Sequence, residues 1–311
     1  MNAITIIVPS LIISFFLNKF FQNYFLKNNY IDKINKRSSH NVLATRSGGT
    51  VIISTLMIIS VISYLVNIEL YEYSILVPIM LLYVVGLYDD INGVSFKLKF
   101  IFQIIVAKVI IDNGLILDNL HGMFGIFDLS TIPAQIITLL IIVSIINSLN
   151  FIDGLDGLAT SVIFIFILCF EFFSKYDSGL INLSTIIVAS SIPVFIGNFS
   201  KNKKIFLGDS GSLFLGSLAS IYILTALSNN YIIKTQFDLN KIIFIISIFF
   251  YPIIDFTRII IRRIINNKSP FVADKNHIHH LLLEKYQSHV KVVGIIFITN
   301  LIVIISLQII F

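Results

Sequence analysis

Ten long apolar segments occupy most of this chain, and they constrain its fold more than any other feature. They lie at residues 3–21, 47–66, 74–88, 98–113, 131–147, 158–173, 181–197, 211–227, 241–260 and 292–310. Hydrophobic residues make up 56% of the sequence and the mean hydropathy is +0.92, which exceeds what a soluble core requires. Inside a bilayer the backbone must satisfy its own hydrogen bonds, so helices are favoured and open strands are disfavoured. We therefore predict an all-α polytopic membrane protein of about ten transmembrane helices, forming one domain over residues 1–311.

Composition and charge say more about what kind of membrane protein this is. The net charge of +5 is modest, and in a membrane protein it indicates cytoplasmic anchoring residues rather than nucleic-acid binding. The one cysteine, Cys169, lies in an apolar segment, so no internal disulfide is expected. The first segment lacks a basic start and a small-residue cleavage site, which favours a retained anchor over a signal peptide. Several segments are nearer to 16 than to 20 residues, which indicates short or buried helices.

The basic residues gather in alternate loops. One set of loops comprises 22–46, 89–97, 148–157, 198–210 and 261–291. With its flanking residues, this set holds all of the 22 lysines and arginines except Lys108, Lys175, Lys234 and Lys241. Cytoplasmic loops of membrane proteins carry such an excess of positive charge, so these loops are predicted to face the cytoplasm.

The most informative polar stretch runs from Asn147 to Gly157, between two apolar segments. Asn147, Asn150 and Asp153 are spaced by three residues, which places them on one face if the helix continues. Carboxylate and carboxamide oxygens favour Mg²⁺ or Mn²⁺ over zinc. The alternative is that these groups only cap two helices.

Two further clusters precede this stretch. Arg37-Ser-Ser-His40 and Arg46-Ser-Gly-Gly49 combine basic, hydroxyl and glycine residues, which suits an anion, although a basic loop that only sets topology would look similar. Asp89 and Asp90 come before Lys97, and paired carboxylates suit a divalent metal or a catalytic base. They would equally suit a solvated helix cap.

Two clusters follow it. Asn198, a lysine patch that includes Lys204, and the run Gly208–Ser212 precede an apolar helix, so a phosphate could bind at the helix N-terminus and Asp209 could bind a metal. The last loop carries His277, His279 and His280, for which phosphate contact is favoured over zinc because no second pair of metal ligands is present. Upstream, Pro252 is expected to kink its segment, and Arg258 and Arg262 suit either an interfacial helix or simple membrane anchoring.

The ordered set of motifs resembles the polyprenyl-phosphate N-acetylhexosamine-1-phosphate transferases over nearly the whole chain. The motifs are Arg37–His40 with Arg46–Gly49, Gly86–Asp90, Asn147–Gly157, Phe206–Ser212 and Ser269–His280. The first and last of these look more like the branch that initiates O-antigen than the peptidoglycan branch. Many relatives have prolines where this chain has Leu43 and Ser47, which leaves the shape of the first loop open.

The resemblance implies that undecaprenyl phosphate attacks a UDP-activated N-acetyl amino sugar, with Mg²⁺ as the cofactor and Mn²⁺ as an alternative. The products are UMP and a lipid-diphosphate-sugar, the first membrane step of O-antigen, lipopolysaccharide or another cell-surface polysaccharide. It places the active site at the cytoplasmic face of the bacterial inner membrane. Its residue roles are catalytic for Asp89, Asp90, Asp153 and Asp156, metal-binding for Asn150 and Asp209, and substrate-binding for Arg37, His40, Arg46, Lys97, Asn147, Asn198, Lys204, Gly208, Ser210, His277, His279 and His280.

Three other functions compete with this assignment. A transferase that forms the first lipid intermediate of peptidoglycan stays open as a close alternative. A transporter would place charges at mid-span and show repeated halves, and neither is visible. A phospholipid-forming alcohol phosphotransferase would have an Ala-Arg pair after the first Asp-Gly, which this chain lacks. The identity of the sugar and the oligomeric state, including a homodimer, stay open.

Overall fold

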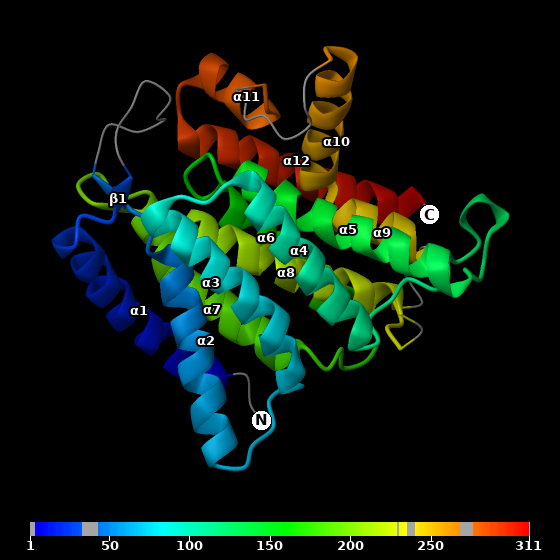
Figure 1. The fold of residues 1–311 in the computed structure, drawn as a ribbon, viewed down its shortest axis with the longest axis horizontal. Coiled ribbons are helices and arrows are strands. Elements are labelled where there is room, and N and C mark those ends of the chain that lie inside the picture. Colours follow the sequence, from blue (N-terminus) through cyan, green and yellow to red (C-terminus); the bar gives the residue numbers. More distant parts are fainter. Residues whose placement is uncertain (1–3, 33–42, 229, 235–239, 268–275, 311) are drawn as a thin grey trace. The chain divides into compact units, whose positions relative to one another are not determined.

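All ten predicted segments are helical in the computed structural model, which describes residues 4–32, 43–228, 230–234, 240–267 and 276–310 (Figure 1). The helices are α1 (Ile4–Lys27), α2 (Gly48–Leu65), α3 (Leu76–Asn92), α4 (Phe96–Asp112), α5 (Thr131–Ile152), α6 (Leu158–Phe173), α7 (Ile181–Asn198), α8 (Gly208–Leu227), α9 (Lys241–Ile248), α10 (Phe250–Ile265), α11 (Ile278–Tyr286) and α12 (His289–Ile310). This architecture confirms the prediction of an all-α polytopic membrane protein.

The number of full-length spans is smaller than the number of apolar segments. Among the described residues, seven helices are long and apolar enough to cross a membrane, and the bent pair α9 and α10 would make an eighth. Helices α4 and α6 have only 17 and 16 residues. The expectation of short, buried helices is confirmed for α6, most of whose side chains are buried in the protein. The ten apolar segments are therefore helical as predicted. Among the described residues, seven or eight of the helices are long enough to span a membrane.

The chain divides into two compact units, each built from two stretches of sequence. Unit 1 comprises Met1–Val94 and Asp177–Leu215, and unit 2 comprises Ser95–Tyr176 and Gly216–Phe311. Helix α8 contributes its first turns to unit 1 and the remainder to unit 2. The single domain expected over residues 1–311 stays a prediction.

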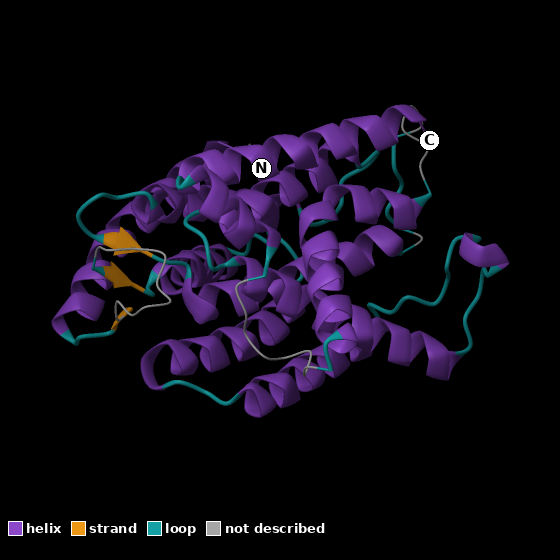
Figure 2. Ribbon diagram, turned by 90° about the horizontal axis from the view of Figure 1, so that it is seen from above, coloured by secondary structure: helices purple, strands orange, loops and turns teal. Residues whose placement is uncertain are grey.

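Unit 1 contains α1, α2, α3 and α7, with α1 packed against both α2 and α7 (Figure 1). It also holds three two-residue strands, β1 (Ile31–Asp32), β2 (Ala44–Thr45) and β3 (Lys204–Ile205). Strand β2 pairs antiparallel with β1 and parallel with β3 (Figure 2). The sequence argument disfavoured strands, but these lie in loops outside the apolar segments, where that argument does not apply.

The Gly48–Gly49 pair begins α2 and allows close packing of the backbone. The N–H groups of Gly48 and Gly49 donate to the carbonyls of Phe206 and Leu207 at 2.9 and 2.8 Å. A Cβ atom on Gly49 would lie 2.2 Å from the backbone nitrogen of Gly211. The sequence suggested that this pair forms an anion-binding turn. The structure instead uses its N–H groups to bring α2 against the start of α8.

Unit 2 packs α5 between α4 and α10, and α12 against α6, α9 and α11. Its interior holds a cluster of aromatic rings, in which Phe170 lies 4.8 Å from Tyr222 and Phe166 lies 5.3 Å from Phe249, measured between centroids. Burial of such large rings supplies much of the packing energy in a helical core.

Helices α9 and α10 meet at an angle of 85° (Figure 1). The break falls at Phe249, three residues before the proline that was expected to cause a kink. Pro252 lies in the first turn of α10, where its missing N–H removes no helical hydrogen bond. The N–H of Tyr251 donates to the side-chain oxygen of Asn300 on α12 at 3.2 Å, so α12 supplies the partner that the broken helix lacks.

We expect Gly49→Ala to destabilise the protein by about 1–3 kcal/mol, because the added methyl group overlaps the backbone of α8. The apparent melting temperature can be followed with a thiol-reactive dye that reports exposure of Cys169, the one cysteine. Gly294→Ala is the matched control, since no neighbouring atom of the described residues lies within 4 Å of its added carbon. An unchanged melting temperature for Gly49→Ala would show that this close contact is absent.

Candidate active site

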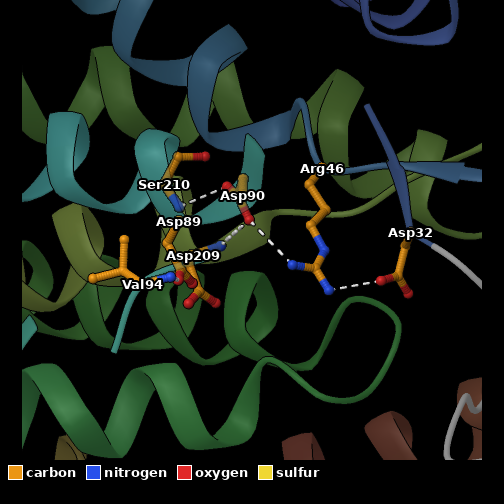
Figure 3. A network of polar contacts seen from close by, with 7 residues as sticks. All are labelled: Asp32, Arg46, Asp89, Asp90, Val94, Asp209 and Ser210. Carbon is orange, nitrogen blue, oxygen red and sulfur yellow. Dashed lines mark hydrogen bonds and ion pairs between the residues drawn. The ribbon is translucent and has the colours of Figure 1, made fainter. Parts of the chain in front are cut away.

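In unit 1 the C-terminal end of α3 meets the N-terminal end of α8. The carboxylate of Asp90 accepts hydrogen bonds from the N–H groups of Asp209 and Ser210, each at 2.9 Å (Figure 3). These N–H groups belong to the first turn of α8, where a helix offers unpaired donors and partial positive charge. The sequence predicted an anion site formed by Gly208 and Ser210. The group that accepts the two N–H hydrogen bonds is the side chain of Asp90 of the chain itself, and the anion site stays a prediction.

Two glycines allow this close approach. A Cβ atom on Gly208 would lie 2.6 Å from Oδ2 of Asp90, and Gly208 has a φ of +75°, which disfavours any other residue. A Cβ atom on Gly86 would lie 2.4 Å from the carbonyl oxygen of Asp209. The Gly86–Asp90 and Phe206–Ser212 motifs are therefore two halves of one contact.

Arg46 links this contact to the small sheet. Its guanidinium lies 2.6 Å from Oδ1 of Asp32 and 3.8 Å from Oδ1 of Asp90 (Figure 3). Burial alone would lower the pKa of Arg46, but the carboxylates of Asp32, Asp90 and Asp209 outweigh it and raise the pKa. The Arg46 side chain is 38% exposed, whereas that of Asp90 is 0% exposed. Arg46 is thus a cation that a phosphate could reach, while Asp90 is enclosed.

Three other predicted residues of unit 1 have described contacts or positions. Asp89 accepts a hydrogen bond from the N–H of Val94 just beyond α3, so it stabilises this helix end. Asn198 ends α7 and donates to the carbonyl of Ile205 at 2.6 Å, which ties β3 to α7. Lys204 lies in β3. The predicted residues Arg37 and His40 lie outside the described residues.

In unit 2 the loop 153–157 joins α5 to α6. Asp153 is the C-terminal cap of α5, and Gly157, with a φ of +75°, precedes α6. Asp156 is buried, and its Oδ2 lies 2.9 Å from Nδ1 of His289, the first residue of α12. His289 was absent from the predicted site. Asp156 and His289 are 133 positions apart, so no local spacing in the sequence indicated this pair.

Asn147 and Asn150 lie on α5, as the spacing predicted, but in different surroundings. Asn147 is 5% exposed, and its amide exchanges hydrogen bonds with that of Gln103 on α4 at 2.7 and 3.3 Å. It also donates to the carbonyl of Val143. Asn147 therefore links α5 to α4, and its role in substrate binding stays a prediction. Asn150 and Asp153 are partly exposed, whereas Lys97 is exposed in the first turn of α4.

The histidine segment, residues 276–280, is held by one face of α10. Asp255 accepts hydrogen bonds from Nδ1 of His277 at 2.6 Å and from the N–H of Ile278 at 2.7 Å. Arg258 donates to the carbonyl of Asn276 at 2.6 Å. Tyr251 Oη lies 3.0 Å from Nδ1 of His279. Residues 251, 255 and 258 are four and three apart, so they share a helical face. Arg258, whose role the sequence left open, holds the start of this segment.

Asp255, His277 and His279 also offer ligand atoms that lie within 4.8 Å of one another. Both oxygens of Asp255 already accept hydrogen bonds, one from an imidazole and one from the backbone. A carboxylate–histidine pair of this kind orients the imidazole without any metal ion. The preference for phosphate contact over zinc at these histidines stays a prediction.

Gly154 connects the histidine segment with the loop 153–157. A Cβ atom at Gly154 would lie 3.5 Å from Nε2 of His279 and 3.6 Å from Cε1 of His280. The two motifs are more than 120 residues apart in sequence and meet within unit 2. Both motifs belong to the site predicted from the sequence, but nothing in the sequence indicated that they are in contact.

Comparison with known proteins gives a consistent result. Residues 73–228 match the protein family described as "Glycosyl transferase family 4". A probable undecaprenyl-phosphate N-acetylglucosaminyl 1-phosphate transferase of Bacillus subtilis (strain 168) is 33% identical over 280 residues, which cover 89% of this chain and 76% of the relative. An undecaprenyl-phosphate alpha-N-acetylglucosaminyl 1-phosphate transferase of Pasteurella multocida (strain Pm70) is 35% identical over 273 residues, covering 81% and 71%.

A more distant relative is a decaprenyl-phosphate N-acetylglucosaminephosphotransferase of Mycobacterium tuberculosis (strain ATCC 25618 / H37Rv). It is 30% identical over 233 residues, which cover 68% of this chain and 57% of the relative. The family match spans half of the chain, and the Bacillus relative aligns with most of it. The chain therefore belongs to glycosyl transferase family 4, within the polyprenyl-phosphate N-acetylhexosamine-1-phosphate transferases.

Proposed function

We propose that this protein transfers an N-acetylhexosamine 1-phosphate from a UDP-sugar to undecaprenyl phosphate. The observation that carries the proposal is the 33% identity over 280 residues to a relative named for this activity. N-acetylglucosamine is the first candidate sugar, because the relatives are named for it. The reaction takes place at the cytoplasmic face of the bacterial inner membrane, in the loops that carry most of the basic residues.

In this reaction an oxygen of the lipid phosphate forms a bond to the β-phosphorus of the UDP-sugar. The bond from that phosphorus to the bridging oxygen breaks, and UMP leaves with the electron pair. A phosphate monoester has a second pKa of about 6, so the acceptor is mostly dianionic at neutral pH and needs no base. Asp90 suits a positioning role better than a base, because both of its oxygens accept hydrogen bonds from α8.

The main requirement is that two anions approach each other. In unit 1, Asp209, whose N–H is fixed by Asp90, would supply an oxygen ligand for Mg²⁺. In unit 2, Asn150, partly exposed near the end of α5, offers an oxygen ligand of the same hard type. Such hard oxygen donors suit Mg²⁺, with Mn²⁺ as the alternative. When bound, the ion would neutralise phosphate charge. Arg46 is partly exposed beside this carboxylate cluster and would add positive charge on the phosphate side.

The nucleotide-sugar side is assigned to the polar groups of unit 2. Asp153 and Asp156 flank Gly154, and His277, His279 and His280 are held beside the same loop. His289 keeps the Asp156 carboxylate in place. These groups offer hydrogen-bond partners for the sugar and the diphosphate, which is what selection among UDP-sugars requires.

The prenyl chain needs an apolar path. Unit 2 contains an apolar cavity of about 430 Å³ whose lining includes Leu140, Ile145, Ile223, Ile246, Phe249 and Ile253. It lies at the bend between α9 and α10. We assign part of the acceptor chain to this cavity. Initiation of O-antigen or another surface polysaccharide is the favoured pathway, and peptidoglycan lipid synthesis is the alternative.

Purified protein in detergent is expected to release UMP from UDP-N-acetylglucosamine only when undecaprenyl phosphate and Mg²⁺ are both present. Chelation with EDTA should stop release and added Mg²⁺ should restore it, because the two phosphates then lose their shared counter-charge. UMP can be measured by a coupled assay and the lipid product by mass spectrometry. Absence of release across a panel of UDP-N-acetyl sugars would refute the proposal.

Asp209→Ala should lower kcat by about 10³-fold, since loss of a metal ligand removes several kcal/mol of charge stabilisation. Asp112→Ala is the matched control, because Asp112 is exposed and pairs with the neighbouring Lys108. Both variants should elute as folded protein in size-exclusion chromatography. Turnover of Asp209→Ala at the level of Asp112→Ala would remove Asp209 from the metal site.

A further inference from the structure

His279 is the most enclosed imidazole of the histidine segment, with 0% of its surface exposed. Its Nδ1 lies 3.0 Å from the hydroxyl of Tyr251. Its Nε2 is buried and has no hydrogen-bond partner among the described residues. A buried polar atom without a partner costs about 1–3 kcal/mol, so such atoms call for a functional or ligand-based explanation.

The tautomer of His279 follows from its surroundings. Burial lowers the pKa of His279 to about 3, with His280 acting in the same direction, so the ring is neutral at neutral pH and carries one hydrogen. The hydroxyl of Tyr251, on a residue only 6% exposed, also needs an acceptor. A phenol donates to an imidazole nitrogen more readily than the reverse. Tyr251 therefore donates to Nδ1, and the ring hydrogen sits on Nε2.

The Nε2 atom lies beside Gly154, a residue without a side chain. It lies 3.5 Å from the position of a Cβ atom on Gly154, and Gly154 is exposed. Nε2 of His280 lies 3.7 Å from the same position. A ligand oxygen over Gly154 would thus be in reach of a fixed N–H donor. Because that donor is neutral, it would not be drawn into an ion pair with Asp153 or Asp156 in the same loop.

Tyr251 is itself held firmly. It follows the 85° bend directly, and its N–H donates to Asn300 at 3.2 Å. Further along the same face of α10, Asp255 and Arg258 hold residues 276–278. The bend therefore orients α10 so that one helical face fixes the whole histidine segment.

We propose that Tyr251 is a positioning residue that holds His279 with its hydrogen on Nε2, so that this nitrogen donates to a phosphate oxygen of the nucleotide-sugar above Gly154. This inference rests on the proposed function for the identity of the ligand. The hydrogen bond to Tyr251 is what selects the tautomer. Without it the imidazole can place its hydrogen on either nitrogen, and the donor toward Gly154 is lost for part of the time.

Tyr251→Phe removes only the hydroxyl, and it should lower kcat/KM for the UDP-sugar by about 5- to 10-fold, the effect of one hydrogen bond. The KM for undecaprenyl phosphate should not change. Tyr231→Phe is the matched control, since the buried Tyr231 donates to the carbonyl of Phe170 at 2.7 Å in the same unit and has no described contact with the histidines. Equal activity of the two variants would overturn the proposal.

A double-mutant cycle separates positioning from a general packing effect. His279→Gln keeps an N–H donor near the position of Nε2 and should retain more activity than His279→Ala. In the His279→Gln background, Tyr251→Phe should have no further effect, because no tautomer remains to be selected. Additive losses would contradict the proposal. Gly154→Ala, which needs no positive φ, should raise KM for the UDP-sugar by filling the space over the loop.

A measurement without turnover keeps this inference apart from the proposed function. NMR spectra of protein labelled with ¹⁵N-histidine distinguish the two tautomers, and the His279 signal among the six histidines is identified by its loss in His279→Gln. Wild type should show hydrogen on Nε2, and Tyr251→Phe should show a mixture. Hydrogen on Nδ1 in wild type would overturn the positioning role. Absence of turnover with every UDP-sugar, beside an Nε2–H signal, would instead refute the proposed function alone.

Discussion

The carboxylate of Asp90 on the first turn of α8 is the interaction on which unit 1 depends. Two backbone N–H groups hold it at 2.9 Å, and a helix N-terminus stabilises a negative charge there. This contact brings α3 to α8 and fixes the backbone of Asp209. Asp90 thus pairs two N–H groups of the first turn of α8 without a ligand. The polar cluster can therefore be rigid before any substrate binds.

Glycines make that contact possible. At Gly49, Gly86 and Gly208 a single added carbon would overlap backbone or carboxylate atoms at 2.2 to 2.6 Å. These glycines fall within motifs that look like phosphate-binding loops. Their described contacts are instead with other parts of the chain, and they set how closely α2, α3 and the start of α8 pack. The same residue type thus serves packing where its sequence context suggests ligand binding.

Unit 2 uses a different device to hold polar groups at the ends of apolar helices. Helix α10 lies at 85° to α9, and its Tyr251, Asp255 and Arg258 side chains contact the histidine segment. His289 at the start of α12 holds the carboxylate of Asp156. Each polar side chain is thereby held by a partner from another helix. Such fixed donors and acceptors lose little conformational entropy when an anionic ligand binds.

The sequence by itself determined the apolar helices, the membrane class and the family. Apolar runs report local burial directly, and the ordered motifs are specific enough to identify relatives. Only the tertiary structure decided which polar groups are paired: Asp90 with the start of α8, Asn147 with Gln103, and Asp156 with His289. It also placed the bend at Phe249 instead of Pro252. The physical reason is that helix formation depends on neighbouring residues, whereas these pairs join residues 44 to 133 positions apart, and local spacing carries no record of them.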